Sequence, residues 1–497
     1  MNLSFNLITE RWIPCIWLNG RSEELSLYDT IAHAHELREI LDNSPLVTSS
    51  LHRLLLAILH RNFGPAGKIE WISLWEKESF DIQIIDEYFT QWRSRFDLFD
   101  PQRPFYQIKD NEVCASRKFP ITKIFHELAS ANNDTLFSHT IDNSPIEVTH
   151  KNISRLLIAY QNYALCDGVS KPFNFSDSPV SREAIVLIKG NTLFQTLMLN
   201  LIIYNDNSPF PRNKNDKPSW EWDTLPYPQK RRSPNGYLDW LTWPSRRINL
   251  ILNDKGIIDH VQILQGDSPN NPDNELNIKN EPMNAIIARG KNRELKSVRF
   301  QIDRSLWRDS YALFSLDSNL GRSPFTIIQL QNIKSNYPKL NNFNYHLEVI
   351  GLCTKPGQDK VHFWRYDKYP LQFVYLDMPV LVGDLSAGLK WAENAGYAIK
   401  KSLNKLQNNI PTVSHFWAML ETAFYEFFVK LPEDRDKAKE RWWKEIFKSS
   451  WRAFDLATES LDGSARTLKA VTKAREELYK ALGRINPIIK EVNTNAE

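Results

Sequence analysis

The side chains that could perform chemistry are scattered along this sequence. The four cysteines share no Cys-x-x-Cys spacing and stand at Cys15, Cys114, Cys166 and Cys353. This pattern argues against a structural zinc site and against a disulfide framework. The eleven histidines form no His-x-x-x-His or His-Glu-x-x-His pattern. We therefore predict no bound metal, no cofactor and a reducing, cytoplasmic environment.

The sequence also contains no glycine loop of the G-x-x-x-x-G-K-[ST] or G-x-G-x-x-G kind. Such loops bind nucleotide phosphates, so we predict neither nucleotide hydrolysis nor helicase activity. The pairs Glu23 with Glu24 and Asp434 with Asp436 are interpreted as surface or helix-start charges, because a two-metal nuclease needs several convergent carboxylates. An enzyme whose site is built from dispersed residues stays open as an alternative.

Basic residues are concentrated in two places, although the net charge of +3 is too small to identify a nucleic-acid-binding protein. Six basic residues lie between Arg289 and Arg304, against two acidic ones. A second cluster, QKRRS, runs from Gln229 to Ser233. Each cluster is compatible with an ordinary solvated face and with binding to a nucleic-acid backbone.

The first 380 residues alternate short strand-like runs with helical runs. Asn19 and Gly20 predict a tight hairpin turn, because this pair tolerates the positive φ angles that such turns need. Residues 49–63 have apolar side chains at helical spacing. His52 and His60 flank that apolar stripe, and we interpret them as surface or hydrogen-bonded histidines and not as a metal pair.

Turn-forming residues predict two longer loops, at 207–222 and 265–277, and both could be mobile. The chain is rich in tryptophan, which in apolar runs favours a core role over base stacking. The tryptophans interpreted in this way are Trp71, Trp75, Trp92, Trp220, Trp222, Trp240 and Trp243.

After Pro379 the pattern becomes helical, with breaker sequences between four amphipathic runs. The predicted helices span 384–407, 412–430, 434–460 and 463–483. Apolar residues at helical spacing predict a core-facing stripe that contains Phe416, Met419, Leu420, Ala423, Phe424, Phe427 and Phe428.

The predicted fold class is therefore α+β. A large mixed α/β domain spans residues 1–380, and a C-terminal four-helix bundle spans residues 381–497. No run approaches 18 uninterrupted apolar residues and the start lacks a signal-peptide pattern, so we predict a soluble protein with no membrane contact.

Several segments, in a fixed order along the chain, match one known family. The opening FNLITERWIPC precedes an Asn-Gly turn and LSLYDTIAHAHEL. The later matches are RFDLFDPQRPFYQ (95–107), ANNDTLFSH (131–139), KGNTLFQTLMLNL (189–201), NGYLDWLTWPSRRI (235–248), EPMNA (281–285), SLWRDS (305–310) and GQDK (357–360). Together they resemble the CasA family, the large subunits of type I-E CRISPR Cascade complexes.

This resemblance implies a non-catalytic subunit that recognises the protospacer-adjacent motif in double-stranded DNA, mainly from the minor groove, and promotes strand separation and R-loop formation. The implied partners are the other Cascade subunits, the CRISPR guide RNA, the target duplex and a separate helicase-nuclease that supplies ATP hydrolysis and cleavage. Beyond the motif, RNA-DNA pairing supplies the sequence specificity. Cysteine clusters of some relatives are absent from this sequence, in line with no zinc.

The first implied DNA-binding element is a glutamine wedge, placed at Gln358. Together with Gly357 and Asp359, this residue would stand at a hairpin tip beneath the first base pair after the motif, with Lys360 near phosphates. Unstacking a base step costs roughly a few kcal/mol, which phosphate contacts and guide pairing must offset.

The second implied element is a lysine finger at Lys279, with Asn280 as its neighbour. A lysine in the minor groove senses base-edge acceptors and the groove's electrostatic potential. The third is a glycine-containing loop within residues 166–178, where Gly168, Val169, Ser170 and Lys171 are the implied contacts. Gly168 is the one glycine of this loop, so the resemblance implies close backbone approach at Gly168 to Lys171, and it does not identify the bases that are contacted.

A docking loop is implied at residues 132–137, with the sequence NNDTLF. Leu136 or Phe137 would be an apolar anchor on the guide-bearing complex, while Asn132 and Asn133 would satisfy backbone or RNA groups. Two alternatives to the binding subunit stay open at this point: a metal-dependent nuclease or hydrolase with a dispersed site, and a structural scaffold of an RNA-protein assembly.

Overall fold

The computed structural model describes residues 3–126, 148–166, 168–269, 281–289, 294–316, 321–342, 344–354, 361–406, 412–459 and 461–486. The chain divides into two compact units. Unit 1 comprises residues 1–302 and 321–371, and unit 2 comprises residues 303–320 and 372–497. The prediction of a mixed helical and sheet protein is confirmed, because the described strands lie in unit 1 among helices while unit 2 is helical where it is described.

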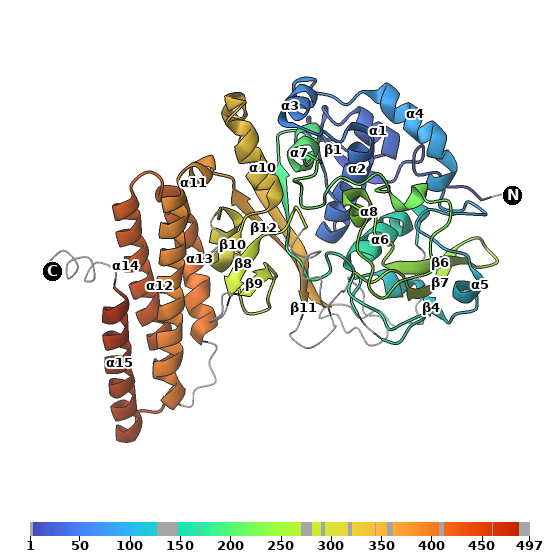
Figure 1. Cartoon of the computed structure of the whole chain (residues 1–497). Coiled ribbons are helices and arrows are strands. Elements are labelled where there is room, and N and C mark those ends of the chain that lie inside the picture. Colours follow the sequence, from blue (N-terminus) through green and yellow to red (C-terminus); the bar gives the residue numbers. More distant parts are fainter. Residues whose placement is uncertain are drawn as a thin grey trace. The chain divides into compact units, whose positions relative to one another are not determined.

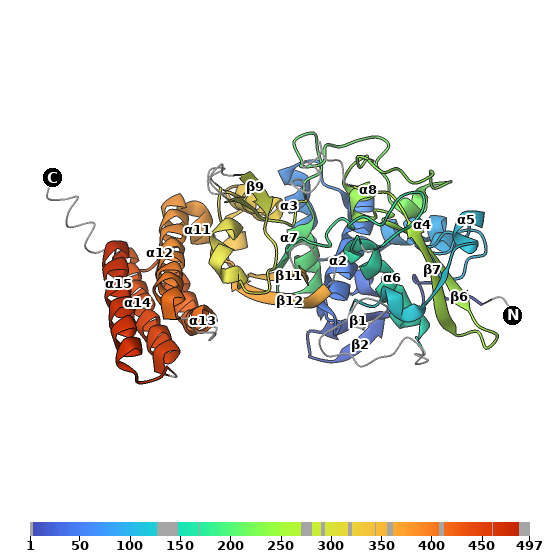
Figure 2. The same cartoon turned by 90° about the horizontal axis from the view of Figure 1, so that it is seen from below.

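The described strands of unit 1 form small antiparallel sheets of three strands each. Their orders are β2-β1-β3, β10-β8-β9, β12-β11-β5 and β4-β7-β6. The strands are β1 Ile13–Trp17, β2 Ser22–Leu25, β3 Leu37–Ile40, β4 Lys118–Pro120, β5 Ile185–Lys189, β6 Arg246–Leu252, β7 Ile258–Gln265, β8 Ile286–Arg289, β9 Glu294–Ser297, β10 Gly321–Arg322, β11 His346–Thr354 and β12 Val361–Pro370. The two longest strands, β11 and β12, are neighbours in Figure 2.

Helix α2 is central to unit 1 and contacts α4, α6, α7, α8 and β11 (Figure 1). The helices are α1 Leu27–Ala32, α2 Pro45–Phe63, α3 Lys68–Glu76, α4 Ile82–Trp92, α5 Asn111–Cys114, α6 His150–Tyr163, α7 Leu193–Asn200, α8 Tyr237–Leu241 and α10 Phe325–Lys334. Every residue of α2 from Leu46 to His60 is buried. A helix buried on all sides is typical of the centre of a large core.

The predicted hairpin is confirmed, because β1 and β2 pair around Asn19 and Gly20. Gly20 has a φ of +88°, which favours glycine. The side-chain oxygen of Asn19 accepts a hydrogen bond from the backbone N–H of Arg21 at 2.9 Å. Local turn chemistry therefore determines this element.

The helix predicted over residues 49–63 is also confirmed, although it begins four residues earlier, at Pro45. Proline is favoured in the first turn of a helix. N–H groups there have no partner within the helix, so proline, which lacks an N–H, loses no hydrogen bond. His52 and His60 are both buried, so of the two interpretations the surface one is wrong and the hydrogen-bonded one is confirmed. Each is hydrogen-bonded: Nδ1 of His52 lies 2.8 Å from the Thr48 carbonyl, and Nε2 of His60 accepts from the Ile202 N–H at 3.3 Å.

Most of the tryptophans predicted to lie in the core do so. Those that are buried are Trp71, Trp75, Trp220, Trp240 and Trp243, whereas Trp92 and Trp222 are half-buried. The predicted loop at 207–222 contains only a short 3₁₀ helix, Ser219–Glu221, but Asp216, Trp220 and Glu221 within it are buried. Its buried side chains hold this segment against the core.

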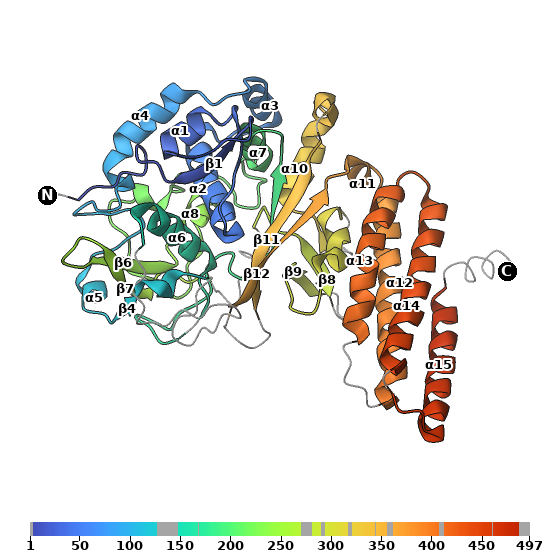
Figure 3. The same cartoon turned by 180° about the vertical axis from the view of Figure 1, so that it is seen from behind.

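The described part of unit 2 contains four long helices, α12 Pro379–Leu403, α13 Thr412–Lys430, α14 Arg435–Glu459 and α15 Ala465–Ile485, together with the short α11 Phe373–Asp377. Helix α12 contacts the other three, and α13 contacts α14 (Figure 3). The predicted stripe on α13 faces the core, with Phe416, Leu420, Phe424, Phe427 and Phe428 buried.

A segment from earlier in the chain also packs with these helices. The 3₁₀ helix Leu306–Leu313 places Trp307 against Trp417, Phe424 and Trp442, with the Phe424 ring stacked at 4.7 Å between centroids. The predicted division between residues 380 and 381 therefore differs from the observed units, because an aromatic core joins residues 303–320 to unit 2.

Candidate nucleic-acid interface

The loop formed by residues 166–178 presents its tip to solvent. Gly168 has a φ of +102°, and a Cβ added there would meet no atom within 4 Å. Val169 is 87% exposed, and Lys171 is also exposed. An exposed valine beside a glycine and a lysine leaves the backbone of this tip open to a ligand.

The two ends of this loop are held together by Asp177. Its carboxylate accepts hydrogen bonds from the Cys166 N–H at 3.0 Å and from Nε of Arg182 at 2.5 Å. Arg182 also donates from Nη1 to Oγ1 of Thr354 at 3.3 Å. Thr354 is the last residue of β11, so one arginine joins the loop to the end of that strand.

Gln265, the buried last residue of β7, holds the same loop from the other side. Its backbone N–H donates to Oγ of Ser170 at 2.9 Å. Its side-chain amide accepts from the Ser176 N–H at 2.9 Å and donates to Oγ of Ser176 at 3.0 Å. Two serines of the loop are thus bound to a single residue of the sheet.

Arg246 lies beneath the loop and is buried in unit 1. Its guanidinium donates to the carbonyls of Leu165, Ser176 and Ser245 at 2.8 to 2.9 Å, and it stands over the Phe175 ring at 5.1 Å. Burial lowers the pKa of Arg246 from its ordinary value. Carbonyl oxygens compensate a buried guanidinium through charge-assisted hydrogen bonds, so this arginine supports the loop from inside.

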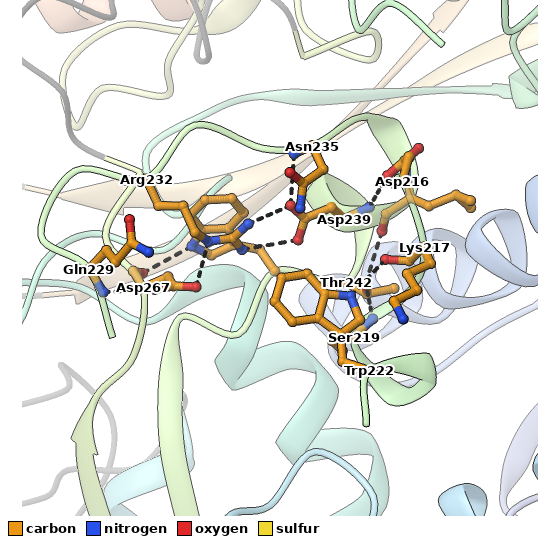
Figure 4. A network of polar contacts seen from close by, with 12 residues as sticks. Asp216, Lys217, Ser219, Trp222, Gln229, Arg232, Asn235, Asp239, Thr242 and Asp267 are labelled. Carbon is orange, nitrogen blue, oxygen red and sulfur yellow. Dashed lines mark hydrogen bonds and ion pairs between the residues drawn. The ribbon is translucent and has the colours of Figure 1, made fainter. Parts of the chain in front are cut away.

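The chain just after β7 enters a buried ionic network (Figure 4). Nε of Arg232 donates to Asp267 at 2.6 Å, and its Nη1 donates to Asp239 at 2.5 Å. The guanidinium stands 3.9 Å from the Trp243 ring centroid, and the Trp243 indole N–H donates to the Asp267 carbonyl at 3.0 Å. Burial raises the pKa of Asp267, and the charge of Arg232 opposes that shift.

The same network begins helix α8. The carboxylate of Asp216 accepts from the N–H groups of Leu238 and Asp239 at 3.0 and 2.9 Å, in the first turn of the helix. Tyr204 donates its hydroxyl to this carboxylate as well. A carboxylate is stabilising at this end of a helix, because the first N–H groups have no partner within it.

Helix α8 also holds Glu281, the first described residue after segment 270–280. The Trp240 indole N–H donates to Oε2 of Glu281 at 2.7 Å, and Nη1 of Arg53 binds the same oxygen at 2.9 Å. Asp239 and Trp240 are consecutive residues of α8. Asp239 is linked through Arg232 to Asp267, which precedes segment 270–280, and Trp240 binds Glu281, which follows it. One short helix therefore holds both flanks.

The sequence of this chain also matches known proteins. A model of the family described as CRISPR-associated protein Cse1 matches residues 6–453. The chain belongs to the Cse1 family. It is 30% identical to the CRISPR-associated protein CasA/Cse1 of Thermus thermophilus, over 98% of this chain and 99% of that protein.

Solved Cse1 structures have the same fold. A crystal structure of CasA from Thermus thermophilus matches with a TM-score of 0.80 at 27% identity, over 97% of this chain and 100% of that one. The Thermobifida fusca Cse1 structure matches with a TM-score of 0.79 at 23% identity, over 97% and 98% of the two chains. A chain of a CRISPR RNA-guided surveillance complex matches with a TM-score of 0.78 at 20% identity, over 96% and 99%.

The structure places only part of the predicted interface of this Cse1-family chain. Gly168, Val169, Ser170 and Lys171 are described, and three of them are exposed while Ser170 is half-buried. The remaining predicted residues lie outside the described residues: Gln358, Gly357, Asp359 and Lys360 of the wedge, Lys279 and Asn280 of the finger, and Asn132, Asn133, Leu136 and Phe137 of the docking loop.

The basic clusters of this Cse1-family chain are only partly solvated. Arg232 of the QKRRS cluster is buried and ion-paired, so neither interpretation of that cluster holds for it. In the second cluster, Arg299 pairs with Glu183 at 3.3 Å, and Lys296 pairs with Glu294 at 2.9 Å. Arg304 binds Asp309 and Glu393 within unit 2.

Sequence reasoning missed Arg182, Gln265 and Arg53, which hold the candidate interface in place. Most of their partners lie far away in sequence, 228 residues for Arg53 and Glu281, although Asp177 is only five residues from Arg182. The one available signal was the position of Glu281 in the family segment EPMNA, beside the predicted finger. A buried acid implies a buried basic partner, but not which one.

Among the described residues, no three His, Cys, Asp or Glu side chains are gathered in an arrangement that could hold a metal ion. In the same part of the chain, no helix combines the length and the apolar run that crossing a bilayer requires.

Proposed function

We propose that this Cse1-family chain is a non-catalytic, cytoplasmic subunit of an RNA-guided Cascade surveillance complex. It recognises the protospacer-adjacent motif of double-stranded DNA, promotes strand separation and R-loop formation, and recruits a helicase-nuclease. Its further partners are the other Cascade subunits and the CRISPR guide RNA. The four long helices of unit 2 act in this proposal as a four-helix bundle that braces the opened complex.

One observation carries this proposal: the loop 166–178 is hydrogen-bonded to residues that lead into the two other predicted DNA-binding segments. Arg182 joins the loop 166–178 to Thr354, the residue before segment 355–360. Gln265 joins the same loop to the strand that leads toward segment 270–280. Elements that read a duplex together need a common rigid base, because contacts must be held in place to discriminate.

The exposed tip at Gly168 to Lys171 fits a minor-groove role. Glycine permits close backbone approach, and lysine adds attraction to phosphates that does not depend on sequence. In this proposal the segment that contains Gln358 separates the first base pair, and the segment that contains Lys279 enters the minor groove. The segment with Asn132, Asn133, Leu136 and Phe137 docks on the guide-bearing complex.

The proposal is tested by assembling the complex with and without this subunit and measuring its affinity for duplexes that differ only in the adjacent motif. We expect discrimination among motifs only when the subunit is present. Equal affinity for all motifs would instead support a structural scaffold. Metal-dependent DNA cleavage by the rigorously repurified chain alone would support the nuclease alternative.

A further inference from the structure

Ser170 differs from its neighbours in the tip of the loop. Gly168, Val169 and Lys171 are exposed, whereas Ser170 is half-buried and its hydroxyl oxygen accepts the Gln265 N–H at 2.9 Å. The same hydroxyl has only a long contact, 3.5 Å, with the carbonyl of Lys171. The side chain of Ser170 is therefore directed toward the sheet and away from the exposed surface.

The N–H that donates to Ser170 belongs to Gln265, which is 0% exposed. A buried backbone N–H without an acceptor is strongly disfavoured. The hydroxyl of Ser170 supplies the acceptor that this buried N–H needs. Gln265 also binds Ser176 through its side chain. The five residues between the two serines are thus held at both ends by one sheet residue.

The remaining contacts of the loop restrict it further. The Phe175 N–H donates to the Gly168 carbonyl at 3.3 Å, which closes the loop across its width. Holding a loop in its binding conformation before the ligand arrives lowers the entropy cost of binding. It also fixes the depth at which the backbone meets a groove, and this depth affects the discrimination between motifs.

We infer that Ser170 is a positioning residue for motif recognition that acts through Gln265, and that it is not itself a DNA contact. This inference rests on the proposed function and deepens it. In this arrangement Lys171 supplies attraction to phosphates. The hydrogen bond from Gln265 to Ser170 keeps the Gly168 backbone at the depth in the groove at which correct and incorrect motifs are distinguished.

The test uses the assembled complex and target duplexes that differ only in the motif. We expect Ser170→Ala to lower the ratio of affinities for correct and incorrect motifs by roughly fivefold, the equivalent of one neutral hydrogen bond. Its salt dependence should match that of the parent, because no phosphate contact is lost. Ser170→Thr keeps the hydroxyl and should restore the ratio.

Two matched variants separate positioning from contact. Lys171→Ala should weaken binding to every duplex and reduce the salt slope by about 1, with little change in the ratio. Gln265→Met keeps the N–H that donates to Ser170 but removes the side-chain amide that binds Ser176, at a buried position that DNA cannot reach, and it should lower the ratio because it releases the other end of the same loop. Hydrogen exchange of the loop amides without DNA should rise in Ser170→Ala, which the loss of a DNA contact would not cause.

The outcomes are distinguishable. An unchanged ratio in Ser170→Ala, with a parent complex that discriminates, overturns the inference and leaves the proposed function standing. A lowered ratio with unchanged hydrogen exchange overturns positioning in favour of direct contact. A parent complex that does not discriminate overturns the proposed function itself. If Gln265→Met does not fold, Ser170→Ala and its exchange measurement still decide the question.

Discussion

Nη1 of Arg53 lies 2.9 Å from Oε2 of Glu281, and the two side chains are 0% and 1% exposed. Arg53 belongs to the central helix α2, and its Nε also donates to Oδ1 of Asn162 at 3.0 Å. Glu281 follows the segment that contains the predicted finger Lys279. The ion pair therefore connects the centre of the core to one flank of a proposed DNA-binding segment.

We predict that Glu281→Gln lowers the free energy of unfolding of unit 1 by about 3–5 kcal/mol. The substitution keeps the shape of the side chain but leaves the guanidinium of Arg53 buried without a carboxylate, which is the costly way to break a buried pair. Denaturation in urea, followed by tryptophan fluorescence, measures the change.

The matched control is Glu294→Gln, which removes the acid of the exposed pair with Lys296, where both side chains are about 60% exposed. Exposed pairs contribute about 0–1 kcal/mol, so this variant should unfold nearly as the parent does. Similar losses in the two variants would show that burial does not set the strength of the Arg53 pair.

The stability of unit 1 should also depend on pH through His60. Burial lowers the pKa of His60 to about 3, from an ordinary value of 6.5. Its Nε2 accepts the Ile202 N–H, and a protonated ring could not accept it. Between pH 6.5 and about 3 the unfolded chain therefore holds a proton that the folded chain lacks, so stability falls as pH falls through this window.

We expect His60→Gln to reduce this pH dependence by about 1.4 kcal/mol per pH unit between pH 6 and pH 4.5, the contribution of one proton. Burial also lowers the pKa of His52 to about 4, so a weaker dependence should remain. Urea denaturation at a series of pH values measures the slope. The exposed His35→Gln is the control, and an equal change in both variants would contradict the role of burial.

In unit 2, Arg308 stands 3.6 Å from the Trp417 ring centroid and donates to both carboxylate oxygens of Glu393, at 2.8 and 2.7 Å. Lysine cannot reproduce a planar fork that stacks and binds two oxygens at once. We predict that Arg308→Lys destabilises unit 2 by about 1–2 kcal/mol, measured by denaturation followed by circular dichroism of the helices.

The control for Arg308→Lys is Arg441→Lys. Arg441 pairs with Glu426 at 2.6 Å, but its side chain is 67% exposed. Lysine can replace arginine in such a pair at little cost, so we expect a change below about 0.5 kcal/mol. A loss in Arg441→Lys as large as that in Arg308→Lys would mean that stacking on Trp417 contributes nothing.

Local signals predicted local structure well. Asn19 and Gly20 predicted a hairpin turn because their own backbone preferences determine it. The helical periodicity after Pro379 gave four spans that agree with α12 to α15 within a few residues at most ends. The predicted start of α12 at residue 384 is too late, because the helix begins at Pro379 and proline is well tolerated in a first helical turn.

Long-range partners could not be predicted from the sequence. Arg232 stands in a basic run that is compatible with a solvated face and with binding to a nucleic-acid backbone, yet it is buried and paired with Asp239 and Asp267. Trp307 lies within a family segment of the predicted first domain, yet it packs in unit 2. Both outcomes depend on which residues that are distant in sequence come into contact. Composition and periodicity do not predict such contacts.

At the candidate interface, the resemblance identifies the family and possible contact residues, whereas the structure identifies the residues that hold them. The resemblance predicted the family, which is confirmed, and proposed contact residues such as Gln358 and Lys279, which stay predictions. The structure adds the residues that hold the flanks of their segments. Ser170 shows the difference, since the resemblance implies that it is a contact, whereas its hydroxyl binds the Gln265 N–H.

The last prediction concerns the proposed wedge. Strands β11 and β12 pair up to Thr354 and Val361, on either side of segment 355–360. Because Arg182 holds Thr354, we expect Gln358→Ala to leave folding and assembly intact while it weakens opening of the first target base pairs beside the motif. Permanganate reactivity of unpaired thymines in these base pairs should fall in the variant complex.

A target with a preformed bubble beside the motif tests the physical reason. Unstacking a base step costs roughly a few kcal/mol, and in a bubble that cost is already met. If Gln358 acts as a wedge, the variant and the parent should open the rest of a bubble target equally well, while they differ on a fully paired target. Equal permanganate reactivity on the paired target would show that Gln358 is not the wedge. A defect that persists on the bubble would assign Gln358 to a later step of guide pairing.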